Sequence, residues 1–197
     1  AFFFFSPAGA HAALYPGDIQ SQPLTATFSS PAGAKDPTGG LLFSPTAPVF
    51  LMSAWESNLL LAEAAARGWI AADADALYAD AVHANFEYAG LDATAADDYL
   101  AAGGAINASN KIKSIAIQKW VCMNGTQPIE SWIETRRLDS PATPIFASPG
   151  GLFKSPTSNS LGVGIYPSIL PYSENEQSLN QNFPGQNALT DKVFWDN

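Results

Sequence analysis

The pattern of apolar and polar positions changes twice along the chain. In residues 1–50, Pro and Gly interrupt every periodic run, and only Phe2–Phe5 and Leu24–Phe28 indicate short strands. From residue 51 to 138, apolar residues recur at helical spacing. Residues 139–197 are again rich in Pro, Gly, Ser and Asn, with scattered aromatics. We therefore expect one domain with an irregular first segment, a helical core and a coil tail that wraps the helices.

The first predicted helix covers residues 54–67. Ser53 followed by Glu56 is a capping-box pattern, and Gly68 is the residue type that favours the C′ position. Glu63 and Arg67 are spaced i,i+4 with the acid first, which suits an ion pair. Four further helices are predicted: from near Asp73 or Asp75 to before Gly90, after Thr94 to Gly103-Gly104, from about Asn110 to Met123, and from Pro128 to about Arg137.

The fourth of these five helices is predicted to bury an apolar face, formed by Ile112, Ile115, Ala116 and Trp120. Pro141 and Pro144 are expected to end the helical region.

Charge is scarce and unevenly distributed. Only 14% of the 197 residues are charged, against about 25% in typical soluble domains. The net charge is −9 and no basic run exists, which argues against nucleic-acid binding. Residues 1–50 hold only Asp18, Lys35 and Asp36 as charged residues. This suggests that part of the surface is covered by something outside this sequence.

No motif for catalysis or metal binding stands out. The two histidines, His11 and His83, have no His or Cys at ligand spacing, and the single Cys122 excludes a multi-cysteine zinc site. The carboxylate pairs Asp97-Asp98 and Glu174/Glu176 each lie within one segment, so they do not form the opposed pair of a glycosidase. We therefore predict no catalytic, metal or cofactor residues, no cofactor and no enzymatic activity.

Polar and aromatic residues are densest from Gln118 to Arg137. Trp132 and Arg136 are spaced i,i+4, Glu134 can reach Arg137, and Glu130 can reach a Lys or Arg on a neighbouring helix. Two interpretations are open: ligand recognition, or a polar lock that ties the last helix to the tail. The helix C-terminal position of the two arginines favours the lock, because cations there suit the helix dipole.

Several segments together resemble the SusD/RagB-like outer-membrane lipoproteins. The run Ser53–Trp69 is similar to the helix written E-x-x-L-x-x-A-E-A in that family. Further similar segments are Tyr78–Gly90, Gln118-Lys119-Trp120 with Trp132–Arg137 (the "QKW … EAWxExRRTGxP" pattern), residues 165–180, and Val193–Asp196. The motif residues carrying the resemblance are Glu63, Gln118, Lys119, Trp120, Trp132, Glu134, Arg136 and Arg137. The match covers residues 50–197, with Leu138-Asp139 in place of Thr-Gly and Ile169 in place of an arginine.

The resemblance implies an all-α fold of tetratricopeptide-like helix pairs with long irregular loops and a coil tail. It also implies that the chain is the C-terminal part of such a protein, with the N-terminal half missing. The implied role is binding of starch-like or other polysaccharide at the bacterial cell surface. The glycan would then pass to a TonB-dependent, SusC-like outer-membrane transporter.

A lipid anchor outside this chain would hold the protein at the outer membrane. No ligand residue is carried over from the family. Two alternatives remain open: a helical-repeat module for protein interactions, and binding of a non-sugar nutrient such as peptide.

Overall fold

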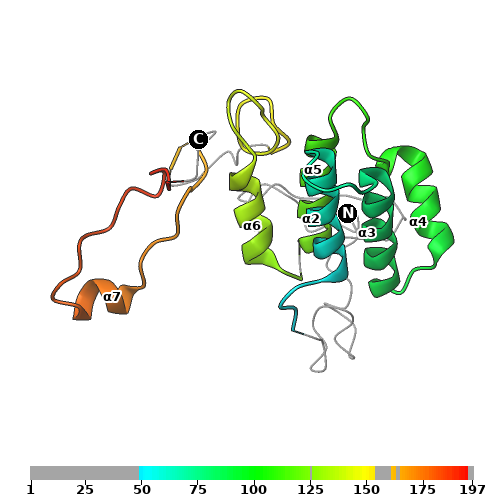
Figure 1. Cartoon of the computed structure of the whole chain (residues 1–197). Coiled ribbons are helices and arrows are strands. Elements are labelled where there is room, and N and C mark those ends of the chain that lie inside the picture. The colour runs from blue at the N-terminus through cyan, green and yellow to red at the C-terminus, as the bar shows by residue number, and fades with distance from the viewer. Residues whose placement is uncertain (1–48, 125, 154–160, 163–164, 195–197) are drawn as a thin grey trace, which may run out of the picture. The chain divides into compact units, whose positions relative to one another are not determined.

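The computed structural model describes residues 49–124, 126–153, 161–162 and 165–194. These residues form helices without a strand, apart from an isolated bridge between Ser140 and Thr143 (Figure 1). The elements are α2 (Ala54–Ala66), α3 (Ala74–Tyr88), α4 (Ala93–Tyr99), the π-helical turn η1 (Leu100–Gly104), α5 (Lys111–Met123), α6 (Pro128–Arg137) and α7 (Glu174–Leu179). The two predicted strands lie outside the described residues.

The chain divides into two compact units, the first of which includes the described residues up to Glu134 and the second those from Thr135 onward. The prediction of one domain, with boundaries at residues 50 and 138, stays a prediction.

Local capping interactions define both ends of α2. The Ser53 hydroxyl accepts a hydrogen bond from the Glu56 amide at 3.2 Å, as the capping-box pattern predicts. At the other end Gly68 has φ +73°, and the Trp69 amide donates to the Ala64 carbonyl at 2.9 Å. This is a Schellman motif, which uses a glycine in the left-handed region to satisfy carbonyls at a helix end. The predicted start and end of this helix are confirmed.

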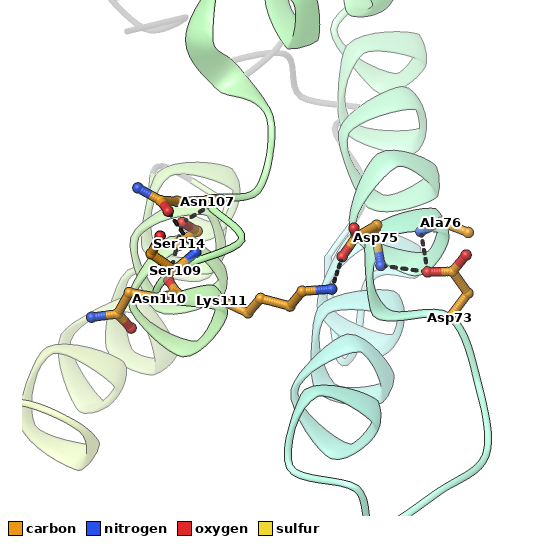
Figure 2. Close-up of polar contacts among 8 residues, drawn as sticks. All are labelled: Asp73, Asp75, Ala76, Asn107, Ser109, Asn110, Lys111 and Ser114. Atoms are coloured by element: carbon orange, nitrogen blue, oxygen red, sulfur yellow. Dashed lines mark hydrogen bonds and ion pairs between the residues drawn. The ribbon is translucent and has the colours of Figure 1, made fainter.

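The helix α3 follows α2 after a short turn and packs beside it (Figure 1). The Asp73 side chain caps it by accepting from the amides of Asp75 and Ala76. Figure 2 shows Lys111, at the start of α5, reaching across to the Asp75 carboxylate. The starts of α3 and α5 are therefore held together by an exposed ion pair.

The third predicted helix begins earlier than expected. The Asp92 side chain caps α4 by accepting from the Ala95 amide at 2.9 Å, so Thr94 lies inside the helix. Aspartate is the stronger N-cap residue of the two, which explains the difference. At its end α4 continues into η1, where Gly103 has φ +108°. A side chain at Gly104 would collide with the Tyr99 ring, which explains why two glycines end this segment as predicted.

The helix α5 begins with Asn110 as its cap, close to the predicted start. Its buried face differs from the prediction. Ile115 and Ala116 are buried as expected, but Ile112 and Trp120 are only half-buried. The remaining buried positions on this helix are Gln118, Lys119, Cys122 and Met123. Two polar side chains thus replace apolar ones in the buried face of α5, because partners on other helices satisfy them.

The core of the first unit lies among α2, α3, α4 and α5. Leu59, Val82, Ile115 and Met123 are among its fully buried side chains. Beside them, Phe50, Trp55 and Tyr88 form a cluster of rings with centroids 5.1–5.3 Å apart.

The second unit contains a helix that the predicted coil tail did not include. The buried Phe146 of this unit contacts Phe153, and Phe153 contacts Tyr166, with ring centroids 5.6 and 6.0 Å apart. The short helix α7, capped by Ser173, was not predicted. That the tail wraps the helices stays a prediction.

Adjacent leucines on α2 provide a direct test of its buried face. Leu59 is fully buried, whereas the Leu61 side chain is 46% exposed. Leu59→Ala should lower the free energy of unfolding by about 2–5 kcal/mol, because it leaves a cavity. Leu61→Ala should change it by less than about 0.5 kcal/mol. Urea denaturation measures both, and equal costs would show that the face is assigned wrongly.

Candidate functional site

The motif residues that carry the family resemblance lie on three helices. Glu63 is on α2, Gln118, Lys119 and Trp120 are on α5, and Trp132, Glu134, Arg136 and Arg137 are on α6. Of these side chains, Glu63, Gln118, Lys119 and Glu134 are buried, Trp120, Trp132 and Arg136 are half-buried, and Arg137 is exposed.

An ion pair joins α5 to α6 inside the first unit. The Lys119 Nζ lies 3.0 Å from Glu134 Oε2, and the two side chains are only 7% and 3% exposed. The prediction that Glu130 would reach a base on a neighbouring helix is wrong, since Glu130 is exposed and Glu134 is the acid that faces α5. The backbone supports the same contact, because the Ser131 hydroxyl donates to the Trp120 carbonyl at 3.3 Å.

A second buried polar group centres on Gln118. Its Oε1 accepts from the Tyr99 hydroxyl at 2.8 Å and lies 3.2 Å from the Tyr78 hydroxyl, and its Nε2 donates to the Cys122 sulfur at 3.3 Å. The Tyr78 hydroxyl also donates to the Gly104 carbonyl at 2.8 Å, which anchors the end of η1. The two tyrosines were missed as partners of Gln118 because they come from other helices.

Burial raises the pKa of the titratable side chains in this group. It raises the pKa of Tyr78, and it raises the pKa of the Cys122 thiol to about 12 despite the hydrogen bond from Gln118. A thiol with so high a pKa is not a nucleophile at neutral pH. The prediction that Cys122 is buried is confirmed, and its inertness stays a prediction.

Two further carboxylates of α2 are buried with partners. Glu56 Oε2 accepts from Gln127 Nε2 at 2.6 Å, instead of turning back to the Ser53 amide as the capping box would have it. This bond connects α2 to the start of α6. Glu63 Oε1 accepts from Arg67 Nε at 2.9 Å, which confirms the predicted i,i+4 pair.

The end of α6 is tied to the tail within the second unit. Arg136 Nη2 donates to the Ser168 hydroxyl at 2.9 Å, which is the kind of contact that the polar-lock interpretation predicts. The predicted contact between Trp132 and Arg136 stays a prediction.

The Asp139 carboxylate organises the loop that follows α6. Asp139 is one of the two residues that replace the Thr-Gly of the family pattern. It accepts four backbone hydrogen bonds of 2.7–3.1 Å from consecutive amides, those of Ile145, Phe146, Ala147 and Ser148. Burial alone would raise the pKa of Asp139, but these four donors outweigh it and hold the pKa below its usual range. The substitution in the family pattern thus has a structural role here.

One exposed aromatic side chain of the first unit is held in place by its neighbours. Trp69 is 71% exposed, and the Arg67 guanidinium carbon lies over its ring, 5.2 Å from the ring centroid. Sequence reasoning noted Trp69 only as part of a motif. An aromatic residue directly after a C′ glycine was the signal that could have singled it out.

One pair of titratable groups lies at the surface between two helices. The Nε2 of His83 lies 3.0 Å from Asp97 Oδ1, connecting α3 to α4 at the surface. Among the described residues, no three His, Cys, Asp or Glu side chains come together as a metal site would need. Nor does that part of the chain contain a helix with the length and hydropathy to cross a membrane.

The described residues have the all-α fold of tetratricopeptide-like helix pairs that the sequence predicted. Comparison with known proteins identifies the family. The model of the SusD-like_2 family, described as starch-binding and associating with the outer membrane, matches residues 7–151. The chain therefore belongs to the SusD-like_2 family. The match begins closer to the N-terminus than the motifs that suggested it.

Two solved structures are similar to the chain. One, a chitin-binding protein, has a TM-score of 0.53 and 29% identity over 72% of this chain and 32% of its own. The other is an outer membrane protein of Bacteroides vulgatus with an attributed role in nutrient binding, at TM-score 0.55 and 25% identity over 87% of this chain and 38% of its own. The chain thus spans about a third of each. No curated protein matches the sequence.

The buried ion pair predicts a large difference between two lysines. Lys119→Ala removes the ammonium that compensates the buried Glu134 carboxylate, and should lower the free energy of unfolding by about 3–5 kcal/mol. Lys111 pairs with Asp75 at the surface, so Lys111→Ala should cost about 1 kcal/mol or less. Urea denaturation compares them, and a Lys119→Ala variant as stable as Lys111→Ala would contradict a buried pair.

The Asp139 loop predicts a pH dependence. The folded-state pKa lies below the unfolded value of about 3.9, so the carboxylate stabilises the fold above about pH 4 and this contribution fades as the pH falls through the folded-state pKa. Asp139→Asn should cost about 1–3 kcal/mol at pH 7.

Thermal denaturation from pH 7 to 3 should show the difference between wild type and Asp139→Asn shrinking in acid. The control is Asp191→Asn, since Asp191 is exposed and accepts one backbone hydrogen bond, from Ala188. A stability difference between wild type and Asp139→Asn that grows as the pH falls would contradict this role of the carboxylate.

Proposed function

We propose that the protein binds glycan at the bacterial outer membrane as a nutrient-binding component, and that it does so without catalysing a reaction. The observation that carries this proposal is the match of the SusD-like_2 family over residues 7–151. The chitin-binding protein and the nutrient-binding outer membrane protein of similar structure add support from two independent relatives.

The geometry agrees with a binding role in two respects. The polar residues of the family motifs are used inside the fold, in pairs such as Lys119–Glu134 and Glu56–Gln127, where they stabilise helix packing. The Trp69 ring, by contrast, presents a flat apolar surface to solvent. Aromatic faces of this kind are suited to the C–H faces of sugars.

The partner that we propose is a TonB-dependent, SusC-like transporter barrel, which would receive the glycan. The proposed location is the outer surface of the outer membrane, with a lipid anchor outside this chain. Both parts of the proposal rest on the family and on the outer-membrane relative.

A binding screen tests the proposed function. Isothermal titration of the purified protein with maltoheptaose, chitohexaose and a set of plant and host oligosaccharides should give saturable binding to at least one of them. Peptide mixtures of similar chain length are the matched probe for the alternative nutrient. Binding to peptides without binding to any glycan would show that the protein takes another nutrient, and binding to neither would favour a protein-interaction module.

A further inference from the structure

The sulfur-containing side chains of the protein lie in very different surroundings. The sequence contains two methionines, Met52 and Met123, and one cysteine, Cys122. Met123 is 1% exposed and Cys122 is fully buried, and both belong to the core of the first unit. Met52, by contrast, is 58% exposed. One thioether is therefore open to solvent, while the other is enclosed by the fold.

The Cys122 thiol is protected from oxidation in two ways. A cysteine reacts with oxidants as its thiolate, and burial raises the pKa of Cys122 to about 12, so very little thiolate forms at neutral pH. Its sulfur also accepts a hydrogen bond from Gln118 Nε2 at 3.3 Å inside the core. A thioether has no proton to lose, so access to solvent is what limits the oxidation of a methionine.

The segment that presents Met52 to solvent is attached to the first unit on both sides. Two residues before it, the Phe50 ring contacts those of Trp55 and Tyr88, with centroids 5.3 and 5.1 Å away. Directly after it, Ser53 caps α2 by accepting from the Glu56 amide. Met52 therefore lies at the surface of a folded segment, beside the start of a helix.

Oxidation would have different consequences at the two methionines. It converts an apolar thioether into a polar sulfoxide. At Met123 the new oxygen would stand among the apolar side chains of the core, where a polar group without a hydrogen-bond partner is costly. At Met52 the oxygen would remain in water. The helical unit can thus accept a sulfoxide at Met52 without loss of its core packing.

We propose that Met52 is a site of reversible oxidation by two-electron oxidants of the peroxide class, and that the fold confines this modification to Met52. The Met52 sulfur donates an electron pair to one oxygen of hydrogen peroxide. The S–O bond forms as the O–O bond breaks, the sulfur is oxidised by two electrons, and the second oxygen leaves as water with both protons. Methionine sulfoxide reductases return such a sulfoxide to the thioether. This inference is independent of the proposed function.

Peptide mass spectrometry of the intact, folded protein treated with hydrogen peroxide at neutral pH tests the site. The Met52 peptide should gain one oxygen at least about tenfold faster than the Met123 peptide, because susceptibility follows exposure. In urea that unfolds the chain, the two peptides should be oxidised at similar rates. Reductases for both sulfoxide epimers, with dithiothreitol, should remove the added oxygen from the folded protein. The oxidised protein should melt within a few degrees of the untreated one.

Two neighbouring positions of α2 provide matched controls, since Leu59 is fully buried and Leu61 is 46% exposed. Exchange of leucine and methionine conserves volume closely enough for both variants to fold. The methionine introduced by Leu61→Met should be oxidised nearly as fast as Met52, and that introduced by Leu59→Met as slowly as Met123. Met52→Leu should take up no oxygen in the time that oxidises wild type.

Three results would overturn the proposal. Equal oxidation of Met52 and Met123 in the folded protein would show that the fold does not select between them. A rate difference that persists in urea would assign the selectivity to the local sequence and not to burial. A Met52 sulfoxide that the reductases leave in place would contradict a reversible modification.

Discussion

A buried ammonium–carboxylate pair holds α6 against α5 in the helical unit. Lys119 and Glu134 are both nearly inaccessible to solvent, and each charge is stabilised by the opposite charge 3.0 Å away. The Ser131 hydroxyl, which donates to the Trp120 carbonyl, adds a second contact between α5 and α6. The Glu56–Gln127 bond then connects the start of α6 to α2, and Gln118 connects α5 to Tyr78 and Tyr99.

The helix ends could be predicted because the interactions that define them are local. Ser53, Gly68 and Asn110 act on amides and carbonyls within a few residues, and the Glu63–Arg67 pair spans one helical turn. The start of α4 was predicted two residues too late. Asp92 and Thr94 are both residue types that cap helix N-termini, and the sequence alone did not show which of them caps this helix. The partner of Lys119 and the buried face of α5 could not be predicted, because they depend on side chains brought in from other helices. For the same reason the exposure of Trp69 follows only from the folded turn.

Most of the residues that suggested the family lie in the interior of the fold. They explain how the helices pack, and they do not indicate which ligand the protein binds. Gln118, Lys119 and Glu134 are fully engaged by their own chain. What distinguishes the binding properties of this protein must therefore lie on its surface.

The polar residues of the family motifs are used in the interior, and we propose that sugar binds at the surface. A crystal structure of the protein with a bound neutral oligosaccharide tests this separation most directly. We expect the sugar to contact exposed side chains, with Lys119 and Glu134 still paired and out of contact with it. A sugar bound instead to Lys119, Glu134 or Gln118, with the buried pair broken, would contradict it.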